Sequence, residues 1–208
     1  MRKVVKTVSL VLVLCGVLIS SGCGSQPSNV LQVDKILAMK SPAIVNYLEG
    51  AGFTYDDDVI GWGGDASQVV EGADSLAITF GDRPEWGDAF RKGEWELQQG
   101  QPLKAVNVVY RTKATGSAQK ALDAVVAAAG FKDSLGTLGK SGSSLAADAS
   151  TAWFKSDIDG EPGVVEVDAI IDTDGELLVI VAARYLSDIT KVYEIENTYE
   201  AYSARFKN

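Results

Sequence analysis

The fold of this chain is decided by the stretch Val164-Val-Glu-Val-Asp-Ala-Ile-Ile-Asp-Thr-Asp-Gly-Glu-Leu-Leu-Val-Ile-Val-Ala-Ala-Arg-Tyr185. Its first run, 164–171, alternates apolar with acidic side chains, as a strand with one buried face does. Its second run, Leu177–Ala183, is apolar throughout, which is typical of a central strand covered on both faces. Between them lies Asp172–Gly175, and its last Asp-Gly pair tolerates the positive φ of a tight turn. The stretch therefore predicts a β-hairpin at the centre of a sheet.

Further strands and helices extend outward from this hairpin. Two more strands are predicted from apolar and valine-rich runs, at Leu76–Phe80 and Leu103–Arg111. Helices are predicted where apolar residues recur every three or four positions, at Val33–Met39, Ser41–Ala51, Ala118–Ala129 and from about Ser187 to the end of the chain. The sum is an α+β fold: an antiparallel sheet, mostly a meander, with helices packed on one face and a C-terminal helix.

The order of helix and strands is repeated along the chain. Ile44, Tyr47, Leu48, Ala51, Gly52 and Phe53 align without a gap with Leu122, Val125, Val126, Ala129, Gly130 and Phe131. A polar, Gly-rich stretch, an aromatic strand and a valine-rich strand follow in both places. One interpretation is an internal duplication, with αβββ-type halves at residues 31–113 and 114–208. The other is coincidence, because many helices end at a Gly followed by an apolar residue.

The first residues of the chain have the pattern of an export leader, which we predict here. Three basic residues among the first six precede an apolar segment, Val8–Ile19, that is too short for a spanning helix. Small residues at 20–22 follow, and then Cys23. This ending resembles the lipobox of bacterial lipoprotein precursors, although Ser20 stands where that pattern usually has Leu.

The lipobox resemblance implies a lipid anchor on Cys23 and covers the leader alone. It implies removal of residues 1–22, a flexible tether over residues 23–30 and a single α+β domain over residues 31–208. The protein is then expected on the outer side of the cell membrane or on the cell surface, with the membrane as its partner through the lipid. An ordinary secretory leader that leaves a free thiol, or an uncleaved signal anchor, are the alternatives.

Charge and residue usage exclude several kinds of function. Without the leader, 16 basic residues face 28 acidic ones, a net charge of −12, and such a surface repels nucleic acid. The chain has no histidine, and of its two cysteines Cys15 lies inside the leader. Histidine-based triads, His-based zinc sites and dithiol chemistry are therefore not available. The sequence indicates no catalytic residue and no cofactor.

Three tryptophans are candidates for a ligand-binding surface. Trp62, Trp86 and Trp95 lie in less regular, Gly-containing segments, where aromatic rings can be exposed for stacking. A place in the core is the alternative for each of them. Trp153 lies in a predicted strand and is expected in the core.

Two polar segments resemble ligand loops without completing them. Ser134–Ser141 approaches a phosphate-binding loop but lacks its first Gly and its flanking strand and helix, so a mobile loop is predicted there. Asp157, Asp159 and Glu161 have the spacing that opens a calcium loop. The twelve-residue pattern is not completed and turn chemistry explains the spacing, so no metal is predicted; these three are the candidates if a calcium ion binds.

These observations predict a non-catalytic, lipid-anchored envelope protein that binds a small ligand or another protein or has a structural role. The alternative is a histidine-free carboxylate enzyme that acts on envelope polysaccharide. It requires a cleft that holds, beside a tryptophan, at least two of Asp56, Asp57, Asp58, Glu85, Glu94 and Glu96.

Overall fold

The computed structural model of the chain describes residues 29–39, 41–56, 61–65, 70, 72–81, 105–141 and 146–206. The strands of this part are β1 (Thr54–Asp56), β2 (Gly61–Gly64), β3 (Ala73–Gly81), β4 (Ala105–Lys113), β5 (Ser134–Ser141), β6 (Asp148–Ile158), β7 (Glu161–Ile171) and β8 (Glu176–Tyr185). Its helices are α1 (Val33–Leu37), α2 (Ser41–Gly50), α4 (Ala118–Ala129), α5 (Leu186–Val192) and α6 (Tyr199–Ala204).

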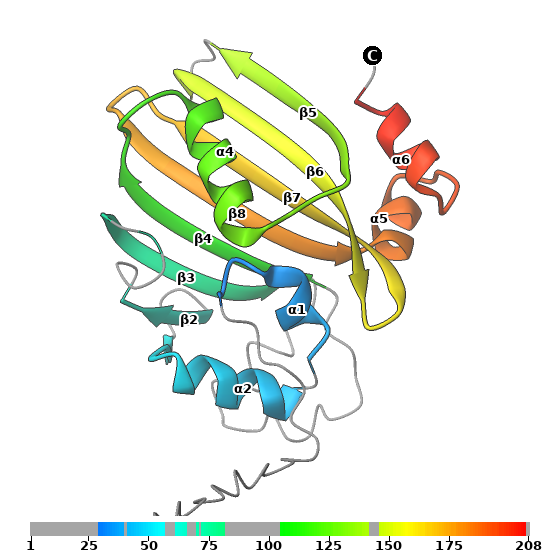
Figure 1. Cartoon of the computed structure of the whole chain (residues 1–208), viewed down its shortest axis with the longest axis horizontal. Coiled ribbons are helices and arrows are strands. Elements are labelled where there is room, and N and C mark those ends of the chain that lie inside the picture. Colours follow the sequence, from blue (N-terminus) through cyan, green and yellow to red (C-terminus); the bar gives the residue numbers. More distant parts are fainter. Residues whose placement is uncertain are drawn as a thin grey trace, which may run out of the picture.

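The strands form one open sheet in the order β1-β2-β3-β4-β8-β7-β6-β5, with every neighbouring pair antiparallel (Figure 1). Strands β1 to β4 follow one another across one half of the sheet, and β5 to β8 do so across the other. The last strands of the two series, β4 and β8, pair at the centre. The predicted α+β class with an antiparallel sheet is confirmed.

The predicted central hairpin is formed by β7 and β8. The backbone N–H groups of Asp174 and Glu176 both donate to the Asp172 carboxylate, at 2.9 Å each. Gly175 has φ 82°, a left-handed conformation that suits glycine. The turn therefore forms for the reason the sequence indicates, and it places β8 between β4 and β7.

Helix α4 is capped at both ends. The Ser117 hydroxyl accepts a hydrogen bond from the backbone N–H of Lys120 at 3.2 Å, and Gly130 closes the helix at φ 77°. The face of α4 that carries Leu122 and Val125 is buried against the sheet. The sequence pattern of this helix is therefore reproduced in the structure.

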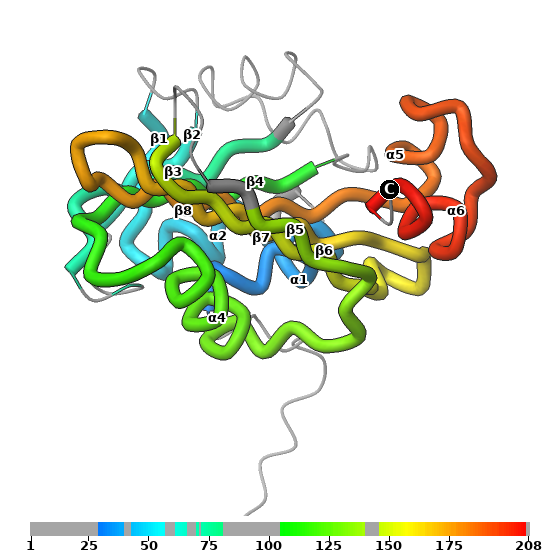
Figure 2. Tube along the Cα trace, turned by 90° about the horizontal axis from the view of Figure 1, so that it is seen from above, coloured from blue at the N-terminus to red at the C-terminus, as the bar shows by residue number. Residues whose placement is uncertain are grey.

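Two hydrophobic clusters pack on the two faces of the sheet. The larger joins α1, α2 and α4 to strand residues such as Val108 and Val179, and α1 and α4 lie on the same side of the sheet (Figure 2). The smaller consists of Trp153, Val164, Leu186, Ile189 and Tyr202. Because side chains alternate along a strand, Trp153 points away from the first cluster, to which its neighbours belong. We call the two sides the helix-covered face and the second face.

Two local predictions are wrong. The C-terminal segment is two short helices, α5 and α6, because Glu194 adopts φ 53° and Thr198 caps a new helix by accepting from the N–H of Ala201 at 3.1 Å. Residues 134–141, predicted as a mobile loop, form the edge strand β5. At the boundary between the predicted tether and the predicted domain, Val30 is buried in the larger cluster.

Candidate functional site

The structure places one of the three candidate tryptophans. Trp62 is 4 % exposed and packs edge-on against Tyr55, with ring centroids 6.2 Å apart. Little of its ring is therefore available to a ligand at the surface. Trp86, Trp95 and the lipidation candidate Cys23 lie outside the described residues.

The calcium candidates lie at the turn between β6 and β7. The Asp157 carboxylate accepts a hydrogen bond from the N–H of Gly160 at 2.8 Å, and Asp159 adopts φ 55°. These are the features of a hairpin turn. Among the described residues, no three Asp, Glu, His or Cys side chains lie close enough to hold a metal ion together.

Of the carboxylates in the enzyme hypothesis, only Asp56 is described. It lines a shallow recess of about 660 Å³, together with Asp74 and Arg111. Trp62 does not line this recess. The other five carboxylates, Asp57, Asp58, Glu85, Glu94 and Glu96, lie outside the described residues.

A cavity on the helix-covered face has the features of a ligand site. It lies between the end of β4, the loop 114–117, the first turns of α4 and Leu177, and its volume is about 230 Å³. Apolar side chains form much of its wall: Val70, Ala121, Ala124 and Leu177. We call it the Tyr110 cavity, after the tyrosine at its base.

Hydrogen bonds hold the walls of the Tyr110 cavity in place. The N–H of Ala114 donates to the carbonyl of Gly175 at 3.0 Å, which fixes the loop to the central hairpin. The N–H of Ala118 donates to the Asp148 carboxylate at 2.8 Å, which fixes the start of α4 to β6. The Thr112 hydroxyl donates to the carbonyl of Gly72 at 2.6 Å. The cavity is therefore preformed, as small-molecule sites usually are.

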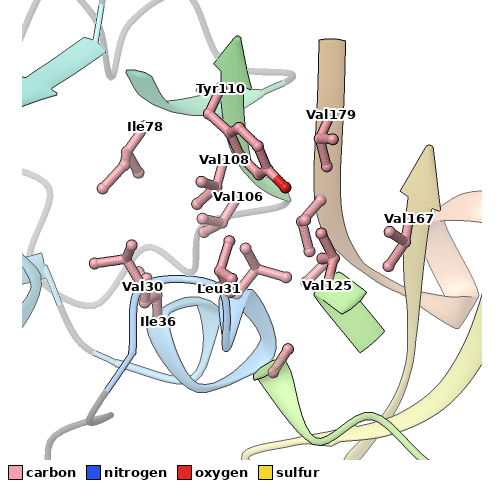
Figure 3. Close-up of a cluster of buried hydrophobic side chains, with 14 of the residues drawn as sticks. Val30, Leu31, Ile36, Ile78, Val106, Val108, Tyr110, Val125, Val167 and Val179 are labelled. Atoms are coloured by element: carbon pink, nitrogen blue, oxygen red, sulfur yellow. The ribbon is translucent and has the colours of Figure 1, made fainter. Parts of the chain in front are cut away.

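Tyr110 brings a buried polar group to this cavity. Its side chain is 3 % exposed, and burial raises the pKa of the hydroxyl to about 12. The ring extends from β4 with its hydroxyl on the side of β8, where Val179 lies (Figure 3). Within the described part of the chain, no hydrogen bond reaches this hydroxyl. The hydroxyl is not one of the fully buried polar atoms of the described residues, so it can bond to water in the cavity or to a ligand atom that displaces that water.

Two lysines, Lys113 and Lys120, bring positive charge to this cavity. The Lys120 side chain runs beside Gly116: a Cβ atom built there would lie 2.9 Å from the Lys120 Cδ and 3.7 Å from its Nζ. Glycine therefore leaves room for the lysine stem beside the loop. No ion pair of Lys120 is formed within the described ranges. The ammonium is thus available to a ligand.

A second polar group of interest, the carboxyl pair Glu166 and Asp168, lies on the second face. Asp168 accepts a hydrogen bond from the Thr151 hydroxyl at 2.5 Å, and Glu166 accepts one from the Trp153 indole. The two carboxyl groups stand two residues apart on β7 and lie close enough for each to affect the pKa of the other.

Burial is the first cause of the unusual titration of this pair. Desolvation raises the pKa of Glu166, and the charge of Asp168 raises it further, while the Trp153 bond and Arg184 oppose the rise. Desolvation also raises the pKa of Asp168, against the hydrogen bond from Thr151. Burial therefore favours the protonated form of both carboxyl groups, and the charge of Asp168 adds to this at Glu166.

Sequence reasoning missed both groups. The residues around Tyr110 come from segments far apart in the chain, and only the apolar alternation of β4 hinted that Tyr110 faces inward. The sequence pattern places Glu166 and Asp168 on the polar face of a strand, and in the structure they do lie opposite the buried side chains of β7. Glu166 interacts with Trp153, Tyr202 and Arg205, and the sequence does not show that these residues lie beside it.

Neither a known protein family, a curated protein nor a solved structure matches this chain. In the described residues, no helix has the length and apolar character needed to span a membrane. The function must therefore be argued from the chain itself.

Proposed function

We propose that the protein is a non-catalytic binding protein of the bacterial envelope, anchored by a lipid on Cys23, which holds a small ligand in the Tyr110 cavity. The observation that carries the binding function is Tyr110, a side chain that is 3 % exposed and lines a preformed, largely apolar cavity, and whose hydroxyl has no hydrogen-bond partner among the described residues. Apolar walls with a few placed polar groups are the usual composition of a ligand site.

The position of the N-terminal segment fits an anchored protein with an accessible cavity. The side chains of Asn29 and Gln32 donate to the carbonyls of Ala128 and Ala129, both at 3.3 Å, so the start of the domain is held at the C-terminal end of α4. The Tyr110 cavity lies at the other end of this 12-residue helix, about 18 Å away. A tether from Cys23 would therefore reach the domain at the end remote from the cavity.

The sequence repeat is also part of this proposal. In both halves a helix ends at a left-handed glycine, Gly52 at φ 85° and Gly130 at φ 77°. The following N–H groups of Phe53 and Phe131 donate to equivalent carbonyls, of Leu48 and Val126. Four consecutive strands follow each helix. We infer two homologous halves that carry α2 and α4 on one face of the sheet; failure of the two halves to superpose would refute this.

Intact-mass analysis of the protein from membranes, beside a Cys23→Ser form, tests the anchor. The proposal predicts a chain that starts at Cys23 and carries a diacylglycerol-sized increment, and release of the Cys23→Ser form from the membrane. An unmodified chain in the soluble fraction would contradict the anchor and would indicate an ordinary secretory leader.

The polysaccharide enzyme remains the alternative proposal. Glycoside hydrolysis uses two carboxyl groups that stand about 5–9.5 Å apart on either side of the scissile bond. Hydrolysis of purified envelope polysaccharide by the full chain, lost in a Glu94→Gln or Glu96→Gln variant, would favour the enzyme over the binding protein.

A further inference from the structure

We propose that the ligand of the Tyr110 cavity is a small organic carboxylate with a compact apolar body, whose acidic group is held by Tyr110 and Lys120. This inference rests on the proposed function, because it takes the cavity to be a ligand site. It names the chemical class that the site selects.

The size and the walls of the cavity define the body of the ligand. A volume of about 230 Å³ is below the range of about 300–1,000 Å³ that drug-sized ligands need. It corresponds to roughly eight water molecules at about 30 Å³ each. The side chains of Val70, Ala121, Ala124 and Leu177 offer only carbon atoms to the ligand. The body is therefore small and apolar, such as one aromatic ring or a short alkyl chain.

The polar groups of the cavity are mainly donors. The Tyr110 hydroxyl has its proton free among the described residues, and Lys120 brings an ammonium. The Ser117 oxygen already accepts from the N–H of Lys120, so its own proton is left for a ligand. Lys113 also lines the cavity. Hydrogen-bond donors beside two lysines favour a ligand that is rich in acceptors and negatively charged.

The N-terminal end of α4 does not contribute to the proposed binding of a carboxylate. Its Ala118 N–H is occupied by the Asp148 carboxylate, which also offsets the positive end of the helix. Recognition therefore depends on the Tyr110 hydroxyl and on the lysines of the cavity, of which Lys120 lies beside the loop at Gly116. In a mature chain with a net charge of −12, most of the surface repels anions, so loss of Lys120 should have a large effect.

Ligand-observed NMR with three probes of one size tests the class. The full chain is taken from membranes into nanodiscs of zwitterionic lipid and titrated with benzoate, benzyl alcohol or benzylammonium, with empty nanodiscs as the blank. We expect benzoate to bind at least tenfold more tightly than the other two. Lys120→Gln should weaken benzoate binding about tenfold, and Tyr110→Phe roughly three- to tenfold.

Two further variants test whether benzoate binds in the Tyr110 cavity and not through the overall charge of the protein. Lys132→Gln makes the same charge change at the other end of α4, where the lysine is exposed, and should leave benzoate binding unchanged. Ala124→Leu places a larger side chain at the wall of the cavity and should abolish binding of every probe.

The outcomes distinguish a wrong ligand class from a wrong site. If benzyl alcohol or benzylammonium binds as tightly as benzoate and Ala124→Leu abolishes it, the carboxylate inference fails and the proposed binding function stands. If no probe binds, or if binding survives Ala124→Leu, the cavity is not the ligand site and both proposals fail.

Discussion

On the second face of the sheet, Glu166 and Asp168 each receive a hydrogen bond from a neighbouring side chain, whereas on the helix-covered face the Tyr110 hydroxyl opens into a cavity without a partner in the described part of the chain. Both groups are partly or wholly withdrawn from water. The difference separates two reasons for burying a polar group. A group with internal partners stabilises the fold, and a group without them is available to a ligand.

The substitution with the largest expected effect on stability removes the Trp153 side chain from the cluster on the second face. Trp153 stacks on Phe206 with centroids 3.7 Å apart and donates to Glu166. Trp153→Ala should lower the free energy of unfolding by about 3–5 kcal/mol in urea denaturation. Leu138→Ala, at a side chain that is 41 % exposed on β5, should cost less than about 1 kcal/mol. If both substitutions lowered the free energy of unfolding equally, the packing around Trp153 would stabilise the fold no more than an exposed side chain on β5 does.

The hydrogen bond to Asp168 sharpens the comparison. Thr151→Val keeps the shape of the side chain and removes the donor, so the Asp168 carboxyl loses a partner. The free energy of unfolding should fall by about 1–3 kcal/mol. Thr137→Val, on the exposed side of β5, serves as the matched control and should change it by less than about 0.5 kcal/mol. An unchanged stability in Thr151→Val would mean that the carboxyl pair does not depend on its internal partners.

The pH dependence of stability tests the raised pKa values of Glu166 and Asp168. Burial raises the pKa of Glu166 and of Asp168, so the folded chain binds protons more tightly than the unfolded one. The resulting stabilisation is complete below the pKa values of the unfolded chain, about 4, and is lost as the pH rises through the raised values.

Glu166→Gln removes one titrating group and the repulsion within the pair. Above about pH 4, the free energy of unfolding of this variant should therefore fall less with rising pH than that of the wild type. Glu176→Gln, at an exposed carboxyl group on β8, should follow the wild-type curve. Parallel curves for Glu166→Gln and the wild type would contradict the raised pKa of Glu166.

The sheet could be predicted because its signals are local. The alternation in 164–171 and the Asp172–Gly175 turn specify the central hairpin without help from distant residues. Strand β5 was missed because Gly136 and Gly139 interrupt its alternation. The break between α5 and α6 was missed because the apolar spacing continues through Glu194, whose left-handed backbone carries no clear sequence signal.

The candidate site could not be predicted, because it depends on tertiary packing. Val70, Tyr110, Lys120 and Leu177 meet only when the sheet is assembled and α4 is docked on it. No spacing in the sequence connects them. The Cys23 anchor, by contrast, is inferred from the leader alone and lies outside the described residues.

One thermodynamic cycle tests the central claim most directly: the free energy of unfolding of the wild type and of Tyr110→Phe, each with and without saturating benzoate. Without benzoate, the account predicts that the variant is as stable as the wild type or more stable by up to about 1 kcal/mol, because no internal hydrogen bond is lost. With benzoate, the wild type should gain more stability than the variant, because it binds the ligand more tightly. A variant that is less stable by more than about 1 kcal/mol without benzoate, or equal gains with it, would contradict the assignment of the Tyr110 hydroxyl to a ligand.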